Sequence, residues 1–479
     1  MTGPTAPGST APGSTARGPR ARGPRALTRK RFLTWLAAIL AVGLTVRLGF
    51  VFIRQSSVEL TGGDAFWYHF QAQLVADGRG FLHPFDYFKS GIVAPGADHP
   101  PGFILILAFL DLIGIGTPQG QRIVMCFVGT ASLAVIAFVG RRLVSDRVGL
   151  IAAAIAAIYP NIWINDGMLM VETVFILASA VVLLGCYRYL DRPNRWDLVL
   201  IASALTVGAM TRPEAMALFG ILVLPLVLAR KALSWKERVA HLGIAALIPI
   251  VAFAPWVIYN LSRFDSPVWL STGAGQTLAV GNCDLTFSGR NLGFYDTNCL
   301  LSPQIKEPTS TDRSVRDAEY RRIASDYIAE HRGELPKVIA ARIGREWHLF
   351  RPGQSLGLDG WVEGRSGGPP GTGFQTVREA LWAYYLLMPL GIAGLVLLRR
   401  RGRKIYPLLA QPLLVTLVAA STFGITRYRA GAEVALVLAA AVTISAIVDR
   451  LFPSADPHPT ERAPDGTAPA GAPEGTGPD

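Results

Sequence analysis

Long apolar stretches separated by short clusters of arginine and lysine form the main pattern of the sequence. The ten stretches cover about residues 32–53, 122–140, 148–165, 169–187, 197–211, 215–229, 239–259, 380–398, 405–424 and 432–449. A helix needs roughly 20 mainly apolar residues to cross the hydrocarbon core of a bilayer. The pattern therefore predicts an all-α integral membrane protein with about ten transmembrane helices.

An additional apolar stretch, 103–116, has about fourteen residues and contains Asp111. We expect it to lie against the membrane or to dip into it. All basic clusters between the spans then fall on one side of the membrane, which the positive-inside rule identifies as the cytoplasm. The first loop, 54–120, and the long polar segment, 261–376, face the outside in this topology.

The composition agrees with a membrane protein, because 51% of the residues are hydrophobic and only 17% are charged. The net charge of +12 comes from the clusters between spans and from the N-terminal tail, so we expect no nucleic-acid partner. The ends, 1–28 and 451–479, are rich in Pro and Gly and are predicted to be disordered cytoplasmic tails. Between them lie an N-terminal transmembrane module at 29–260, the external segment at 261–376 and C-terminal transmembrane helices at 377–450.

The first external loop opens with a polar sequence that predicts a short helix, GGDAFWYHFQAQL. Asp64 stands after two glycines, where the N-cap of a helix is expected. Phe66, Phe70 and Leu74 follow at i, i+4 and i+8, which is typical of a helix lying in the membrane surface. This places the carboxylate of Asp64 at the water boundary.

The external segment contains two predicted amphipathic helices, 314–331 and 334–350. The second has an apolar stripe, and its basic edges, Arg342, Arg345 and Arg351, suit an anionic lipid surface. Packing of this stripe against the transmembrane bundle is the alternative. Cys283 and Cys299 lie in the same segment, and we expect them to form a disulfide on the external side.

Several charged residues come to the outer surface in this topology. They are Asp64, Asp166 and Glu172 from WINDGMLMVET, Arg212 from TRPEA, and Arg427 and Arg429 from TRYRAGAE. External loops are usually poor in basic residues, so the arginines need a reason to be there. Binding of a phosphate is one, since guanidinium groups match its oxygens well.

Each of these residues also has a structural interpretation. Asp64 and Asp166 could cap helices, Glu172 could pair with an arginine inside the bundle, and Arg212 or Arg429 could extend to the membrane interface. His99 could bind a metal ion, but no second ligand is suitably spaced, so a structural turn before Pro100 is favoured. The residues predict no cofactor with certainty, and a divalent metal ion stays an open alternative.

The sequence resembles the GT-C glycosyltransferases through GGDAFWYH, the downstream HPPG, the NDG and Glu of the second external loop, and the order of spans. The nearest group is family 39, which includes protein O-mannosyltransferases and aminoarabinose transferases. The resemblance is strongest over residues 32–215. It implies that Asp64 is the catalytic base, that Asp166 supports the site, and that external arginines meet the lipid phosphate of the donor. Arg212, Arg427 and Arg429 are the candidates for this contact by their position, and we expect Glu172 and His99 to be further support residues. Ala65 follows Asp64 where protein mannosyltransferases often have a second acid, which weakens the case for a protein acceptor.

The expected activity is transfer of a sugar from a polyprenyl-phosphate donor to a hydroxyl of a lipid, glycan or protein acceptor, at the external face of the plasma membrane. Phosphate is a good leaving group, so one carboxylate suffices as general base for an inverting reaction. A ligase-like enzyme that uses a diphosphate-linked donor is one alternative. A lipid or solute transporter is another, although the sequence shows no internal repeat of spans.

Overall fold

The computed structural model describes residues 27–56, 58–301, 310–361 and 375–452. Residues 27–446 form one compact unit. The other unit combines residues 1–26 with 447–479, and of these only the last turn of α19 and Phe452 are described. The predicted disordered tails therefore lie almost wholly outside the described residues.

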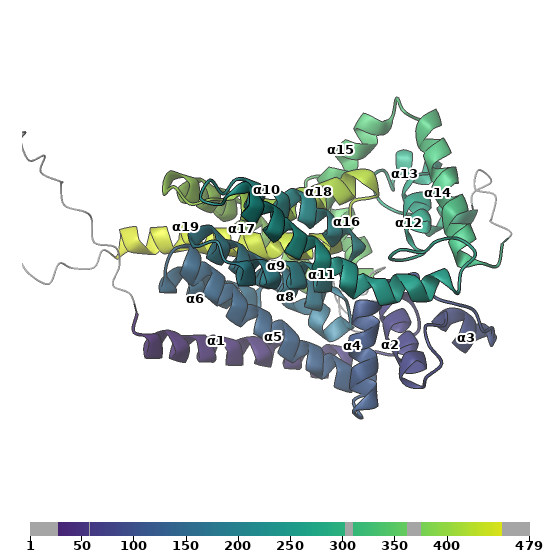
Figure 1. Cartoon of the computed structure of the whole chain (residues 1–479), viewed down its shortest axis with the longest axis horizontal. Helices are drawn as coiled ribbons and strands as arrows, with labels where there is room; N and C mark the ends of the chain where they lie inside the picture. Colours follow the sequence, from purple (N-terminus) through teal and green to yellow (C-terminus); the bar gives the residue numbers. More distant parts are fainter. Residues whose placement is uncertain (1–26, 57, 302–309, 362–374, 453–479) are drawn as a thin grey trace, which may run out of the picture. The chain divides into compact units, whose positions relative to one another are not determined.

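The described chain is helical, with a single β-bridge between Leu82 and Pro95. In chain order (Figure 1), the elements are α1 (Arg29–Phe50), η1 (Val51–Gln55), α2 (Gly63–Ala76), α3 (Pro84–Ser90), α4 (Pro101–Leu112), α5 (Pro118–Leu143), α6 (Asp146–Ile158), α7 (Pro160–Trp163), η2 (Ile164–Met168), α8 (Glu172–Asp191), α9 (Arg195–Thr211), η3 (Pro213–Met216), η4 (Phe219–Val223), α10 (Leu224–Leu228), α11 (Trp235–Leu261), α12 (Ala274–Gly281), α13 (Asp284–Phe287), η5 (Thr297–Leu301), α14 (Arg313–Glu330), α15 (Leu335–Glu346), α16 (Pro352–Trp361), α17 (Gln375–Arg400), α18 (Tyr406–Ser421), η6 (Thr426–Arg429) and α19 (Ala430–Leu451).

The long helices begin where the sequence carries capping residues. Thr117 accepts a hydrogen bond from the backbone of Gly120 at the start of α5, and Pro118 follows as the first helical residue. Ser234 and Glu237 form a capping box at the start of α11. These polar signals bound the apolar runs, and they explain why the predicted spans and the observed helices agree closely.

Six described helices are long and apolar enough to cross a membrane, or seven if α6 is joined with the bent segment Pro160–Met168, which turns by 75°. The all-helical membrane fold is thereby confirmed, whereas the count of ten is not. Two shorter apolar helices, Pro213–Leu228 and Tyr406–Ser421, lie at predicted spans and account for part of the difference. A third, Pro101–Leu112, is the stretch that was expected not to span.

The main apolar core is shared by α5, α6, α8, α17 and α19. The helices α1, α5 and α6 lie side by side (Figure 1), and α8 packs against both α5 and α9. Small residues allow close approach: Gly140 of α5 faces Gly149 of α6, where an added Cβ would lie 2.8 Å from the opposite backbone. This packing fixes the helix ends from which the polar site is built.

The helix α2 differs from the expected surface helix. It packs against α4, and not only Phe66 and Leu74 but also His69 and Gln71 are buried. Its N-cap is Gly62, so Asp64 lies in the first turn and does not cap the helix. The Asp64 side chain is consequently available for contacts outside its own helix.

The lipid-facing role predicted for three arginines is wrong for the two that lie in α15, whereas Arg351 lies after that helix, directly before α16. Arg342 and Arg345 are 2% and 0% exposed. Arg342 donates to the carbonyl oxygen of Gly281 at 2.7 Å, and Arg345 donates to that of Leu292 at 2.6 Å. The alternative interpretation applies, because α15 packs against α18 of the bundle. Each guanidinium group is thus buried with a backbone carbonyl oxygen of the external segment as a hydrogen-bond partner.

Candidate active site

Four helix ends meet at a cluster of charged side chains, which we call the Asp64 cluster: Asp64, Glu172, Arg212, Glu214 and Arg427. Asp64 and Glu172 lie in the first turns of α2 and α8. Arg212 follows α9 and precedes η3, which carries Glu214, while Arg427 lies in η6 before α19. These segments are up to several hundred residues apart in sequence, and the helix packing brings their termini together.

The cluster is a continuous chain of ion pairs. Arg427 donates from Nη2 to Oδ2 of Asp64 at 2.9 Å, and its Nε lies 3.3 Å from Oε1 of Glu172. The same Glu172 oxygen accepts from Nη1 of Arg212 at 2.9 Å. Nε of Arg212 bonds to Glu214 at 2.7 Å. Arg427 therefore bridges two carboxylates, and Glu172 bridges two arginines.

Exposure is highest at the two ends of this chain of ion pairs, Asp64 and Glu214, whose side chains are 29% and 26% exposed. The side chain of Asp64 is 29% exposed and that of Arg427 is 16% exposed, whereas Arg212 and Glu172 are 6% and 1% exposed. A ligand that enters at the Asp64 end therefore meets Asp64 and Arg427 before it meets Arg212. Glu172 and Arg212 form the buried support behind them.

The electrostatic surroundings keep Asp64 ionised. Burial by itself would raise the pKa of the Asp64 carboxyl group, but the positive charge of Arg427, assisted by His99 and Arg212, holds that pKa below its ordinary value. The carboxylate form is the one that can accept a proton.

His99 joins the cluster from the first external loop. Its Nε2 lies 3.8 Å from Oδ1 of Asp64, and its Nδ1 is 3.3 Å from the hydroxyl of Tyr68. The indole of Trp67 contacts the imidazole edge-on, with 5.5 Å between ring centroids. The sequence singled out His99 as a support residue or a turn residue, and the structure places it beside the carboxylate.

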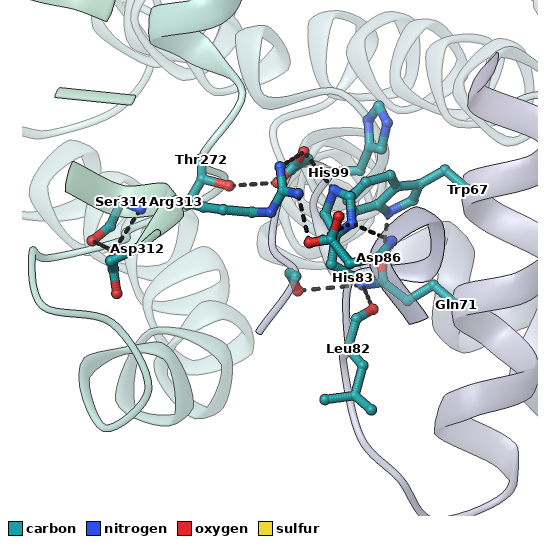
Figure 2. A network of polar contacts seen from close by, with 12 residues as sticks. Trp67, Gln71, Leu82, His83, Asp86, His99, Thr272, Asp312, Arg313 and Ser314 are labelled. Carbon is teal, nitrogen blue, oxygen red and sulfur yellow. Dashed lines mark hydrogen bonds and ion pairs between the residues drawn. The ribbon is translucent and has the colours of Figure 1, made fainter. Parts of the chain in front are cut away.

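A second polar network, shown in Figure 2, anchors the loop that carries His99. Arg313, at the start of α14, bonds to Asp86 at 2.7 Å and lies 3.7 Å from Asp98. Asp98 also accepts a hydrogen bond from Thr272 at 2.8 Å and lies 3.7 Å from His83. Because Asp98 directly precedes His99, this network fixes the first loop against the external segment.

Two of the predicted site residues lie in other ion pairs. Asp166 bonds to Nε of Arg47 at 2.7 Å, and both side chains are buried. Arg429 bonds to Glu433 at 2.5 Å, with both side chains nearly inaccessible. The structure thus brings together Asp64, Glu172, His99, Arg212 and Arg427, but it places Asp166 and Arg429 in separate buried pairs.

The sequence reasoning missed several neighbours of the cluster. Tyr428 lies under Arg212, whose guanidinium carbon is 4.5 Å from the ring centroid. Glu214 lies in the motif TRPEA and Tyr428 in TRYR, so their closeness in sequence to Arg212 and Arg427 could have indicated that they belong to the site. The Arg313 network had no such signal, because its members come from distant loops without a shared motif.

Within the described ranges, no group of three or more His, Cys, Asp or Glu side chains is arranged to hold a metal ion. The space between Asp64 and Glu172 is bridged by the guanidinium of Arg427. In the external segment, Cys283 and Cys299 form a disulfide, while Cys126 and Cys186 are buried free thiols.

Comparisons with known proteins agree with this architecture. Residues 98–259 match the model of the dolichyl-phosphate-mannose-protein mannosyltransferase family. The match includes His99, Glu172 and Arg212, whereas Asp64 and Arg427 lie outside it. No curated protein sequence matches the chain significantly.

Among solved structures, the oligosaccharyltransferase of Archaeoglobus fulgidus is similar to this chain. Its apo form matches with a TM-score of 0.51 and 13% identity, over 88% of this chain and 51% of that one. The form tethered to an acceptor peptide gives 0.51 and 13%, over 89% and 50%. The complex with zinc and sulfate gives 0.50 and 15%, over 87% and 49%. This chain therefore spans about half the length of that enzyme.

Both kinds of match confirm the resemblance found in the sequence. The family model lies in the N-terminal part of the chain, and the fold similarity extends over nearly all of it. The chain is a multi-pass membrane protein with the GT-C glycosyltransferase fold.

Proposed function

We propose that this protein transfers a sugar from a polyprenyl-phosphate donor to an acceptor hydroxyl group, with Asp64 as the general base. The observation that carries the proposal is the partly exposed ion pair of Asp64 and Arg427. It places a proton acceptor beside a cation at an accessible end of the Asp64 cluster. The family model supports the donor class, because its description names dolichyl-phosphate-mannose.

Arg427 and Arg212 have different roles in this proposal. A departing polyprenyl phosphate needs positive charge near its oxygens, and the donor phosphate reaches Arg427 before the more buried Arg212. The phosphate competes with Asp64 for Arg427. As Arg427 turns toward the phosphate, Asp64 loses its strongest attractive partner and becomes a better proton acceptor. Donor binding thereby prepares the base.

The transfer step follows from this arrangement. The acceptor oxygen attacks the anomeric carbon while its proton passes to the Asp64 carboxylate. The bond between that carbon and the phosphate oxygen breaks, and its electron pair leaves with the polyprenyl phosphate. One displacement inverts the anomeric configuration. Glu172 is a poor candidate for the second, nucleophilic carboxylate that retention needs, because it is 1% exposed and held by two arginines.

The donor class is tested with the purified full chain and a panel of sugars linked to polyprenyl monophosphate and diphosphate. We expect release of polyprenyl phosphate from a monophosphate donor in the presence of an acceptor, and a product of inverted configuration by NMR. Turnover of diphosphate donors alone would favour the ligase-like alternative. Passage of an intact substrate across vesicles without bond cleavage would favour the transporter.

The external location of the site is part of the proposal and has its own test. Single cysteines replace Ser90 in α3, Ser325 in α14 and Lys236 in α11, all of which are exposed. An impermeant thiol reagent applied to intact cells should label the first two positions and spare the third. The reverse pattern would place Asp64 on the cytoplasmic side. The native cysteines interfere little, since two are buried and two are in the disulfide.

A further inference from the structure

A basic cavity lies in the external segment, lined by residues that take no part in the Asp64 cluster. Its volume is about 620 Å³, and its lining residues are Gly289, Arg290, Leu292, Lys337, Arg351 and Gln354. Three of the six are cationic, and none is acidic. The cations come from three segments: the loop after α13, the helix α15, and the turn before α16. Such a lining has the chemistry of an anion site.

The cations of this basic cavity are not used to neutralise acids of the fold. Within the described ranges, neither Arg290, Lys337 nor Arg351 forms an ion pair with a carboxylate. Arg290 and Lys337 are exposed. Their charges are therefore available to a ligand.

Arg351 is fixed at the cavity by its backbone and by its side chain. Its φ angle is +48°, a left-handed conformation that non-glycine residues rarely adopt. Its Nη1 donates to the carbonyl oxygens of Gly289 and Arg290 at 2.7 and 2.9 Å. Those bonds use one nitrogen of the guanidinium group and hold the turn before α16 against the loop after α13.

A fourth positive charge, that of Arg345, is bonded to two of the residues that line the basic cavity. Arg345 is fully buried and donates to the carbonyl oxygen of Arg290 and to Oε1 of Gln354, both at 3.0 Å. Its Nη1 is buried and has no hydrogen-bond partner among the described residues. Burial, with a contribution from repulsion by the positive charge of Arg351, lowers the pKa of Arg345 to about 10. An anion in the cavity would relieve that repulsion.

The surroundings of the cavity indicate where such an anion comes from. Leu349, two residues before Arg351, is 66% exposed, and Trp382 near the start of α17 is 67% exposed. The two segments are tied together, because Tyr385 donates to the carbonyl oxygen of His348 at 2.8 Å. An exposed Trp near the end of a membrane-spanning helix, as Trp382 is, is typical of the lipid headgroup region.

We propose that this basic cavity binds a phosphoryl group, with an anionic membrane phospholipid as the source that the exposed Leu349 and Trp382 favour. The site is independent of the proposed transfer reaction. The sequence pattern had placed Arg342, Arg345 and Arg351 at a lipid surface. In this proposal Arg351 keeps that role, and Arg290 and Lys337 take the place of the buried Arg342 and Arg345 as direct contacts.

The test compares three forms of the full chain in a neutral detergent: the parent, the double variant Arg290→Gln/Lys337→Gln, and the matched control Arg322→Gln/Arg332→Gln. All four substituted side chains are exposed, and each double variant removes two positive charges from the external segment. Arg351 is retained because it holds the backbone. Binding of phosphatidylglycerol and phosphatidylcholine is followed by native mass spectrometry, and binding of inorganic phosphate by calorimetry. Thermal unfolding verifies that all three forms are equally folded.

We expect the parent and the control to bind phosphatidylglycerol alike and the cavity variant to bind it roughly tenfold or more weakly, because two charge-assisted contacts are lost. Phosphatidylcholine should not distinguish the three forms. Loss of inorganic phosphate binding alone in the cavity variant would support the phosphoryl site with a soluble source. Equal affinities of all three forms for both anions would overturn the proposal.

Discussion

Arg427 and Arg429 stand two residues apart in the same short turn, η6, yet they enter different kinds of ion pair. Arg427 is 16% exposed and bridges Asp64 and Glu172. Arg429 is 1% exposed and bonds to Glu433 at 2.5 Å. Its surroundings are closed further by Tyr159, which donates to Glu433 at 2.9 Å.

The difference shows that one turn can carry both a structural arginine, Arg429, and an arginine that a substrate can reach, Arg427. Arg429 also donates to the carbonyl oxygen of Glu346 at 2.9 Å and stacks on Tyr384 with 3.8 Å to the ring centroid. These contacts fix the backbone of η6. Arg427, on the open side of the same turn, keeps a partner that a substrate can replace. The buried pair therefore positions the open one.

Breaking the buried pair should have the largest effect, and that effect should be on folding. Glu433→Ala leaves Arg429 buried without its carboxylate, which typically costs about 3–5 kcal/mol of stability. We expect a strongly lowered melting temperature in detergent. The matched variant Glu214→Ala removes a carboxylate that is 26% exposed and should lose much less. Equal melting temperatures for the two variants would remove the distinction between buried and open pairs.

Breaking the open pair should affect turnover instead. Arg427→Ala removes the cation that the donor phosphate meets first, and loss of one such electrostatic contact lowers rates by roughly a hundredfold. Arg427→Lys keeps the charge but loses the bidentate geometry, so it should retain more activity. Initial rates at saturating donor, together with melting temperatures, make the measurement. A variant that unfolds as readily as Glu433→Ala would place Arg427 with the structural residues.

The sequence predicted the helices and most of the site for a clear physical reason. Whether a segment crosses the membrane, and in which direction, depends mainly on its own apolar residues and on the basic residues beside it, so both can be read from the sequence. The same topology brought Asp64, Glu172, Arg212 and Arg427 to one surface. It could not say that Asp166 pairs with Arg47, because partner choice inside a bundle depends on helix packing. An arginine within the first apolar run was nevertheless a signal, since a charge in a span requires a partner.

A smaller effect is expected where the first loop meets the external segment. Arg313→Gln removes the ion pairs to Asp86 and Asp98 (Figure 2). The side chains of Asp86 and Asp98 are 28% and 20% exposed, so the loss should be about 1 kcal/mol or less, a few-fold in rate. We expect KM for the acceptor to rise with little change in kcat, and Arg313→Lys to restore it partly. An unchanged KM would mean that the loop position does not depend on this network.

The smallest effect concerns the pH dependence of kcat/KM. Arg427 holds the pKa of Asp64 below its ordinary value, against the effect of burial. In Arg427→Gln the opposing attraction is gone, so the pKa of Asp64 rises and less of it is ionised at a given acidic pH. The acidic limb of the profile should therefore move to higher pH. The control Arg322→Gln changes a residue that takes no part in the Asp64 cluster and should leave the limb in place. A limb that stays fixed in both variants would show that Asp64 does not control it.

Asp64→Asn tests the central claim most directly. The substitution keeps the size of the side chain and can still accept a hydrogen bond from Arg427, but it cannot take up a proton. Turnover and donor binding are measured on the same preparation, with Asp166→Asn as the companion variant and rates expressed per folded molecule. General-base catalysis is typically worth roughly a hundred to ten thousand fold. We predict that Asp64→Asn binds the donor and loses at least about a hundredfold in turnover, whereas Asp166→Asn loses stability and keeps its turnover. Turnover of Asp64→Asn within a few fold of the parent would contradict the account.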